Sequence, residues 1–130
     1  MASIDELIGF VAAHRRLFVL TGAGISTGSG IPDYRDAAGQ WKLAQPIRYQ
    51  DFIASDTARR RYWARSLVGW PRFARARPNA AHTALATLEN QGRVLQLVTQ
   101  NVDRLHQRAG GRRVIDLHGR LDRVDCLTCQ

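Results

Sequence analysis

The alternation of hydrophobic and polar positions predicts a series of short strands and helices. Ser3 and Glu6 have the spacing of a capping box, so we expect a helix that starts there and ends near His14. The apolar side of this amphipathic helix consists of Leu7, Ile8 and Val11. The apolar run 17–21 then leads into glycines, which is the pattern of a buried parallel strand that feeds a loop.

Two more strands are predicted further along, at 94–99 and 114–117, and each ends in polar residues. A helix is expected to begin after Pro78-Asn79, and a short helix is expected through His106. Strands that alternate with helices are typical of an α/β fold with a Rossmann-like parallel sheet. Ligands of such sheets bind just beyond the carboxyl ends of the strands.

The first two predicted strands are about seventy residues apart, whereas a minimal crossover needs only a dozen or so. The segment 28–46 is rich in Gly, Pro, Asp and Ser and has no steady period, which indicates a loop. The segment 51–75 is predicted to be helical, with apolar contacts from Tyr62, Trp63, Leu67, Trp70 and Phe73. We therefore expect a helical insertion or lid between these strands.

The composition is that of an ordinary globular protein. The chain has 130 residues, of which 45% are hydrophobic and 23% are charged, so a disordered, collagen-like or coiled-coil chain is excluded. The length alone predicts one domain. No apolar run approaches the roughly 20 residues of a membrane span. Asp5 and Glu6 near the N-terminus argue against a secretory signal.

The net charge of +8 is concentrated in one segment. Seven arginines and no acidic residue lie between Arg59 and Arg77, and the other 12 basic residues nearly balance the 11 acidic ones. A basic stretch can bind nucleic acid, and it can equally form the solvated face of a helix. We favour the solvated face and keep nucleic acid as a secondary hypothesis.

The chain has two cysteines, Cys126 and Cys129, separated by two residues. They are too few for a disulfide scaffold and indicate a reducing compartment. Structural zinc needs four ligands, so the pair can be half of a zinc site, a redox motif or two exposed thiols. Its position at the end of the chain favours half of a site, the start of a small zinc-binding module at 126–130.

A glycine-rich segment follows the first predicted strand and contains Gly22, Ala23, Gly24, Gly28 and Gly30. Glycines let backbone N–H groups approach a pyrophosphate closely. Thr27 stands where the third glycine of the dinucleotide fingerprint would fall, and the lysine of a P-loop is missing. The segment indicates a phosphate-binding loop, with a simple tight turn as the alternative.

The same segment matches the G-x-S-x-G nucleophile elbow of α/β-hydrolases, with Ser26 as the nucleophile. An acid, Asp103 or Asp116, and then His118 follow in the expected chain order. The glycine and alanine that precede the motif have no role in an elbow, and such hydrolases are usually much longer chains. We favour a Ser26 hydroxyl that binds phosphate or caps the next helix, and keep a serine hydrolase as the alternative.

Polar residues follow the second and third predicted strands. Gln100, Asn101 and Asp103 can together bind ribose hydroxyls and a carboxamide, and helix capping by Asn101 or Asp103 is the alternative. His118 follows the third strand, where an imidazole that titrates near neutral pH can act as a general base. The other histidines are expected at a helix end or in local packing, namely His14, His82 and His106.

Four motifs stand in one order along the chain. They are Gly22-Ala-Gly-Ile-Ser-Thr-Gly-Ser-Gly-Ile-Pro-Asp-Tyr-Arg35, Thr99-Gln-Asn-Val-Asp103, Leu117-His-Gly119 and Cys126-x-x-Cys129. Together they closely resemble the sirtuin family of NAD-dependent protein lysine deacylases. The segments Arg61-Tyr-Trp-Ala-Arg65, Gly69-Trp-Pro71 and Pro78-Asn-x-x-His82 are most similar to the class of the mitochondrial sirtuin four and its bacterial relatives.

This resemblance implies a role for each matching residue. The site for the NAD phosphates and ribose would be lined by Gly22, Ala23, Gly24 and Ser26. The mobile cofactor loop would be formed by Ile31, Pro32, Asp33, Tyr34 and Arg35. The nicotinamide ribose and carboxamide would be held by Gln100, Asn101, Val102 and Asp103. The catalytic base would be His118, and two of the four ligands of a structural zinc ion would be Cys126 and Cys129.

The resemblance also implies a reaction. In the family, the acyl oxygen of an acyl-lysine attacks the nicotinamide ribose, nicotinamide is expelled, and the base drives transfer of the acyl group to ADP-ribose. The implied partners are NAD and an acyl-lysine protein, in a bacterial-type cytoplasm or, in a eukaryote, in mitochondria. A protein ADP-ribosyltransferase is an alternative.

The resemblance covers nearly every residue of the chain but only about the first half of the family's catalytic domain. The second cysteine pair and the remaining strands of the family are absent from these residues. We therefore expect one incomplete catalytic domain at 1–130, with the cofactor loop and helical insertion at 36–79. A non-catalytic fragment that binds NAD is a further alternative.

Overall fold

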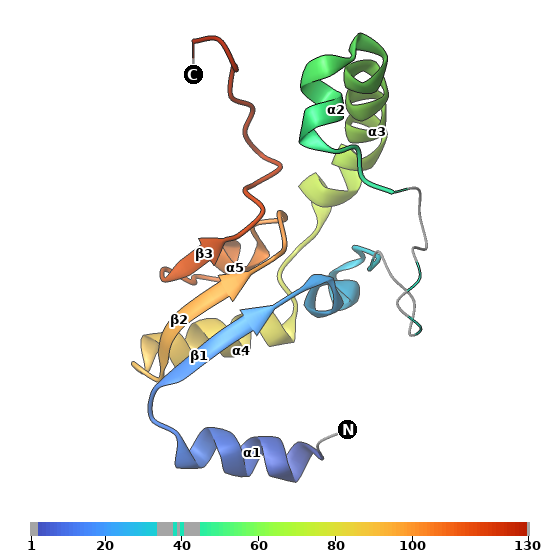
Figure 1. Cartoon of the computed structure of the whole chain (residues 1–130). Coiled ribbons are helices and arrows are strands. Elements are labelled where there is room, and N and C mark those ends of the chain that lie inside the picture. Colours follow the sequence, from blue (N-terminus) through green and yellow to red (C-terminus); the bar gives the residue numbers. More distant parts are fainter. Residues whose placement is uncertain (1–2, 34–37, 39, 41–44, 130) are drawn as a thin grey trace.

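The computed structural model describes residues 3–33, 38, 40 and 45–129, which form a parallel sheet with helices (Figure 1). Within these residues the strands are β1 (Leu17–Thr21), β2 (Val94–Thr99) and β3 (Val114–Asp116), in the order β1-β2-β3. Both neighbouring pairs are parallel. The α/β class is confirmed, β1 and β2 have the predicted bounds, and β3 ends one residue earlier than predicted.

Helices connect the strands. The described residues form α1 (Ile4–Ala13), the 3₁₀ helix η1 (Ala23–Ser29), α2 (Tyr49–Ala54), α3 (Asp56–Arg75), α4 (Ala80–Asn90) and α5 (Leu105–Arg108). The segment predicted as one helix at 51–75 is divided, because Ser55 is extended and its side chain accepts the N–H of Ala58 as the N-cap of α3. None of these described helices is long and apolar enough to cross a membrane.

The strands end level with one another. Thr21 of β1 pairs with Thr99 of β2, and Thr99 pairs with Asp116 of β3. The Gln100 N–H donates to the Thr21 carbonyl oxygen (3.0 Å), and the Leu117 N–H donates to the Thr99 carbonyl oxygen (2.9 Å). The segments that leave the three strands therefore emerge side by side, at the edge where parallel sheets bind their ligands.

The described residues cover one face of the sheet more fully than the other, where Val98 of the central strand is buried but its neighbours on the outer strands are exposed. Helix α4 packs against β2 and α5 (Figure 1), and Leu97 and Leu105 are almost fully buried. The register places Leu20 of β1 and Ile115 of β3 on the same face, and Phe18, two positions before Leu20, lies on this face too. The side chains of Leu20, Ile115 and Phe18 are 58%, 48% and 65% exposed. We call them the bare face, which is unusual because parallel sheets generally have both faces covered.

Helix α1 forms with its predicted capping box and its predicted end at His14. Its apolar side is largely uncovered within the described part of the chain, since Leu7 and Ile8 are 59% and 61% exposed and Val11 is only partly buried. Arg93 Nη2 donates to the carbonyl oxygen of His14 at 3.0 Å, just before β2 begins. The helix is therefore attached to the sheet by polar contacts at its carboxyl end rather than by burial of its apolar side.

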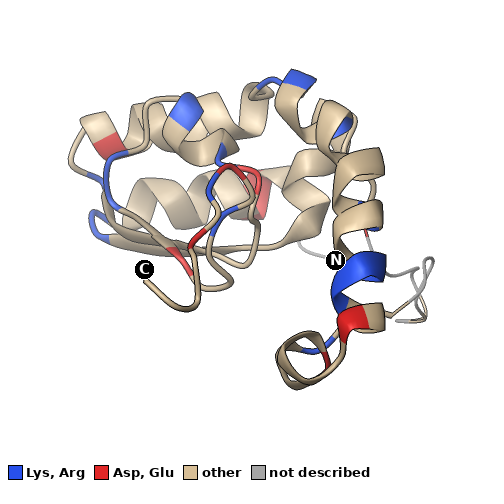
Figure 2. Cartoon of the chain, turned by 90° about the horizontal axis from the view of Figure 1, so that it is seen from above, with Lys and Arg blue, Asp and Glu red and all other residues tan. Residues whose placement is uncertain are grey.

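The arginine-rich helix α3 uses part of its charge within the insertion. Arg60 pairs with Asp56 at 2.7 Å. Arg59 donates to the carbonyl oxygens of Phe52 (3.2 Å) and Ile53 (3.1 Å) near the end of α2. The Lys and Arg positions, blue in Figure 2, lie on several elements. Two arginines of α3 are therefore engaged in contacts within the insertion.

Candidate functional site

The glycine-rich segment after β1 folds into η1. Gly22 precedes η1 in an extended conformation, and Gly30 ends it in the left-handed region (φ 82°), which favours glycine. The Gly30 N–H donates to the carbonyl oxygen of Thr27 at 3.0 Å. A Cβ added at Gly22 or Gly24 would meet nothing within 4 Å, so a ligand can approach the backbone there. The segment is both a tight turn and an accessible loop.

Ser26, at the centre of η1, holds this loop to the end of β2. Its side chain is 1% exposed, and its hydroxyl donates to Asp103 Oδ2 at 2.6 Å. Asn101 Nδ2 donates to Ser26 Oγ (3.1 Å) and to the Gly22 carbonyl oxygen (3.0 Å). Asp103 Oδ1 accepts the N–H of Leu105, the first residue of α5, at 2.9 Å, although the N-cap of α5 is Arg104.

The contacts of Ser26 argue against a serine hydrolase. A nucleophilic serine passes its proton to a histidine base, whereas the Ser26 hydroxyl donates to a carboxylate. Within the described residues, no histidine is bonded to Ser26. Asp116, the second acid of that hypothesis, is instead held by Arg104 and Gln107. The nucleophile-elbow interpretation is therefore rejected.

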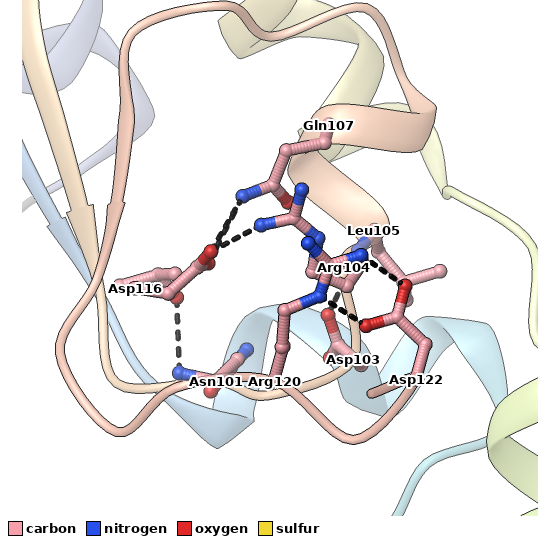
Figure 3. A network of polar contacts seen from close by, with 9 residues as sticks. Asn101, Asp103, Arg104, Leu105, Gln107, Asp116, Arg120 and Asp122 are labelled. Carbon is pink, nitrogen blue, oxygen red and sulfur yellow. Dashed lines mark hydrogen bonds and ion pairs between the residues drawn. The ribbon is translucent and has the colours of Figure 1, made fainter. Parts of the chain in front are cut away.

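A network around Asp116, which the sequence did not predict, lies at the same edge of the sheet (Figure 3). Arg104 forms an ion pair with Asp116, and Gln107 Nε2 donates to both carboxylate oxygens of Asp116 (2.9 and 3.1 Å). Arg104 has a left-handed backbone (φ 64°), which costs a residue with a side chain about 1–2 kcal/mol. The ion pair offsets part of this strain and joins the start of α5 to the end of β3.

Two buried histidines adjoin the strand ends. Thr21 Oγ1 donates to Thr99 Oγ1 (2.8 Å) and lies 2.9 Å from His106 Nε2. The rings of His106 and His82, which are 3% and 0% exposed, have centroids 4.9 Å apart. Burial and the neighbouring His82 lower the pKa of His106 to about 4, against the charges of nearby aspartates, and burial also lowers the pKa of His82. Both rings are neutral at pH 7, and the predicted local packing is confirmed.

His118 lies just beyond β3, as predicted, and is exposed. Its Nδ1 lies 2.9 Å from the carbonyl oxygen of Gln100. A carbonyl oxygen only accepts hydrogen bonds, so Nδ1 carries the proton of the neutral ring and Nε2 has the lone pair. In this tautomer Nε2 can accept a proton from a substrate hydroxyl.

The structure describes the first part of the predicted cofactor loop. Ile31 is 4% exposed and packs in an apolar cluster with residues of α3 and α5, which anchors the start of the loop. Pro32 is exposed, and Asp33 is partly buried. Tyr34 and Arg35 lie outside the described residues, so their role stays a prediction.

Cys126 and Cys129 lie on one turn, and both thiols are free and exposed. Hydrogen bonds from the backbone of Cys129 and Thr128 hold the pKa of the Cys126 thiol below its ordinary value. Among the residues that the structure describes, no group of three or more His, Cys, Asp or Glu side chains could hold a metal ion. Two thiols on one turn fit half of a tetrahedral zinc site.

A hollow of about 260 Å³ lies beside Val102 and Asp103, which the resemblance assigns to the nicotinamide ribose and carboxamide. Trp70 and Phe73 of α3 contribute aromatic side chains to its wall. The other lining residues are Ala74, Arg104, Arg108, Leu121 and Asp122. The helical insertion and the strand ends therefore share a partly apolar space next to the site.

The Sir2 family profile matches residues 22–130. NAD-dependent protein deacetylase 2 of Bradyrhizobium diazoefficiens is 68% identical over 125 residues, which are 96% of this chain and 46% of that protein. NAD-dependent protein deacetylase of Bordetella pertussis is 64% identical over 129 residues, which are 99% of this chain and 47% of that protein. The chain thus spans about half the length of these curated relatives.

Solved structures have the same fold. A complex titled Sir2-p53 peptide-NAD+ has a TM-score of 0.84 and 36% identity, and the match covers 99% of this chain and 51% of that one. A Sir2 bound to an acetylated peptide has a TM-score of 0.81 and 35% identity, over 99% of this chain and 50% of that one. The resemblance inferred from the four motifs is confirmed, and this chain belongs to the Sir2 family, the sirtuins.

Proposed function

We propose that the chain provides the NAD-binding half of the catalytic site of an NAD-dependent protein deacetylase. The observation that carries this proposal is the meeting of three segments at one edge of the sheet, namely η1, the end of β2 and His118. The Bradyrhizobium relative, which is 68% identical, is named NAD-dependent protein deacetylase 2, and this name supports the proposal. Because the chain spans about half of that relative, the activity of the whole protein is part of the proposal.

The residues of η1 and β2 fit NAD. The open backbone at Gly22 and Gly24, with Ala23 between them, lets a pyrophosphate approach main-chain N–H groups. Ser26 acts by tying this loop to β2. The segment 100–103, which follows β2, is assigned to the nicotinamide ribose and carboxamide. The likeness to a Sir2 complex with NAD+ supports this assignment.

His118 is proposed as the general base. NAD, when bound, supplies the ADP-ribose that receives the acyl group, and nicotinamide is released. The Gln100 carbonyl oxygen accepts the Nδ1–H of His118, which leaves the Nε2 lone pair to take a proton from a ribose hydroxyl. The same carbonyl oxygen stabilises the positive ring that results. His118 thus holds and moves the proton from a fixed position beyond β3.

The acyl group is proposed to come from an acyl-lysine of a protein or peptide. Solved relatives that contain a p53 peptide or an acetylated peptide support this substrate class. The aromatic side chains of Trp70 and Phe73 offer apolar surface for a lysine alkyl chain in the adjoining hollow. A bacterial-type cytoplasmic location, to be checked by cell fractionation, agrees with two free cysteines.

The activity is tested with the chain alone and with the chain joined to the remaining residues of the Bradyrhizobium relative, which we call the joined form. With NAD and an acetyl-lysine peptide, the joined form should release nicotinamide only when both substrates are present. His118→Ala should lower kcat by a factor of about 10²–10⁴, the usual contribution of a general base.

His14→Ala is the matched control for this test. His14 is also an exposed histidine, and its Nδ1 lies 2.8 Å from the carbonyl oxygen of Phe10, but it is at the end of α1, away from the strand ends. It should leave kcat unchanged. Full activity of His118→Ala would show that the base is another residue. Transfer of ADP-ribose to protein in place of deacylation would favour the ADP-ribosyltransferase alternative.

The chain alone has a second candidate function, NAD binding without turnover. The bare face favours it, because a sheet with one poorly covered face lacks part of its usual packing. Calorimetry of NAD with the chain alone distinguishes the two functions. Binding without nicotinamide release supports a non-catalytic fragment, and release by the chain alone excludes it.

We further propose that Cys126 and Cys129 are two of the four ligands of a structural zinc ion. Their thiols are exposed on one turn, where two further thiolates can complete a tetrahedron. Zinc content, measured by atomic absorption on the joined form, should be lost in Cys126→Ser. It should be retained in Leu127→Ala, which changes an exposed residue between the cysteines. Retention in both variants would exclude the site.

A further inference from the structure

The motif Pro78-Asn-x-x-His82 has no role in the proposed reaction, yet Asn79 lies between α4 and η1. Asn79 is the N-cap of α4, and its Oδ1 accepts the N–H groups of Ala81 (3.0 Å) and His82 (3.4 Å). The His82 Nδ1 lies 3.0 Å from the same oxygen. These contacts fix the orientation of the amide, with Oδ1 directed to α4 and Nδ2 available for another partner.

The Nδ2 half of this amide binds η1, which lies 50 or more residues earlier in the chain. Asn79 Nδ2 donates to the Ile25 carbonyl oxygen (2.7 Å) and to Ser29 Oγ (3.0 Å). A Cβ added at Gly28 would lie only 3.3 Å from Nδ2, so the two segments are closely packed. Asn79 therefore binds η1 at Ile25 and at its last residue, Ser29, whereas Asn101, just after β2, binds Ser26 at its centre and Gly22 just before it.

We infer that Asn79 is a positioning residue for NAD binding, whose Nδ2 fixes η1 against α4 so that the open backbone at Gly22 and Gly24 keeps its binding geometry. This inference rests on the proposed function of η1. Asn79 acts through Ile25 and Ser29. A loop that is held from two sides, here by Asn79 and by Asn101, loses less conformational freedom when a ligand binds, and this preorganisation raises affinity.

Substitution can separate the two halves of the amide. Asn79→Asp keeps an acceptor oxygen, and Asp is as good an N-cap as Asn, but an oxygen then replaces the donor that faces the Ile25 carbonyl oxygen. Asn79→Ala removes both functions. Ser55→Ala is the matched control, since it removes the side-chain cap of α3, where Ser55 Oγ accepts the Ala58 N–H, and makes no contact with η1.

Hydrogen exchange of the chain is the first measurement. In Asn79→Asp, the amides of Gly30 and Ile31, which donate to carbonyl oxygens within η1, should exchange roughly tenfold faster, and the amides of α4 should stay within about twofold. In Asn79→Ala, the amides of α4 should also exchange faster. Ser55→Ala should leave η1 and α4 unchanged.

NAD affinity is the second measurement. The dissociation constant of NAD should rise roughly tenfold in both Asn79 variants and stay constant in Ser55→Ala. In the joined form the KM for NAD should rise by a similar factor while kcat changes less, because Asn79 supports binding and moves no proton. A loss of kcat with an unchanged KM would contradict the positioning role.

Three other results would overturn the inference. If hydrogen exchange of η1 is unchanged in Asn79→Asp, Asn79 serves only as the N-cap of α4. If exchange accelerates equally in η1 and α4, the change in η1 follows from loss of that cap and not from loss of the Nδ2 contacts. Faster exchange of η1 with unchanged NAD affinity would remove the positioning role and leave the proposed function intact. If the wild-type chain and the joined form both fail to bind NAD, the proposed function fails, and the exchange data still decide whether Nδ2 holds η1.

Discussion

Ser26 is the residue at which η1 and β2 are joined. Its hydroxyl donates to Asp103 and accepts from Asn101, so a single buried oxygen uses both of its hydrogen-bonding functions. Truncation at this position leaves a buried carboxylate oxygen and a buried amide without this partner. These contacts of Ser26 therefore stabilise the position of the loop relative to the segment that follows β2.

Ser26→Ala should lower the free energy of unfolding by about 1–3 kcal/mol, the usual cost of leaving buried polar groups unpaired. Thr27→Ala is the neighbouring control, because Thr27 is exposed and its hydroxyl donates only to the Gly24 carbonyl oxygen among the described contacts. Thr27→Ala should change stability by less than about 0.5 kcal/mol. Chemical denaturation measures the free energy of unfolding of both variants. Equal losses in the two variants would show that the contacts of Ser26 do not contribute to stability.

At the scale of single residues, the sequence predicted which side chains belong to the candidate site better than it predicted their hydrogen-bonding partners. Ser26, Asn101 and His118 could be selected because their motifs are local and each follows an apolar run. The contact of Ser26 with Asp103 could not be derived from spacing alone, since it joins positions 77 apart. Nothing in the sequence indicated the ion pair of Arg104 with Asp116, because neither its geometry nor the left-handed backbone of Arg104 has a sequence pattern.

At the scale of elements, α4 and α5 bring together two buried neutral histidines, His82 and His106. The ordinary pKa of histidine is 6.5, whereas burial lowers the pKa of both and that of His106 to about 4. The aspartates 103 and 116 act in the opposite direction on His106. As the pH falls below 6.5, the unfolded chain binds protons before the folded chain does, so the free energy of unfolding decreases.

The packing of α4 against α5 should therefore be pH-dependent. We expect these histidines to leave the free energy of unfolding unaffected above about pH 6.5 and to lower it by about 3 kcal/mol as the pH approaches about 4. Denaturation across this range measures the slope. His106→Gln should flatten the slope, because it removes the histidine whose pKa burial lowers to about 4. A wild-type slope of zero would contradict the burial argument.

Elements were predicted well where their signals were local. The bounds of β1 and β2 follow from apolar runs that stop at polar or glycine-rich segments, and the start of α1 follows from its capping box. The division of 51–75 at Ser55 was missed because serine also occurs within helices, and only its extended backbone shows the break. The exposure of Leu7 on α1 depends on tertiary packing, which periodicity does not contain.

At the scale of the whole molecule, the bare face is the main departure from a typical parallel sheet. Phe18, Leu20 and Ile115 form it, and large exposed apolar surfaces favour association. The chain alone should therefore self-associate in a concentration-dependent manner, which sedimentation velocity can detect. The double variant Phe18→Thr, Leu20→Thr should be more monomeric, since threonine retains strand propensity while removing apolar area.

Leu67→Gln is the control for this prediction. Leu67 is 73% exposed, but it lies on α3 rather than on the sheet. Its substitution should leave the association unchanged. A wild-type chain that stays monomeric at all concentrations would show that the bare face does not mediate self-association.

The pairing of β1 with β2 also determines when the site can form during folding. Ser26 and Asp103 are 77 positions apart, and the hydrogen bond of Thr21 with Thr99 spans 78. Contacts of such long sequence separation require the closure of a long loop, and they slow folding relative to local contacts. During synthesis, η1 cannot acquire its contact with Asp103 until residue 103 has left the ribosome. Competence to bind a ligand should therefore appear late and cooperatively, together with the parallel sheet.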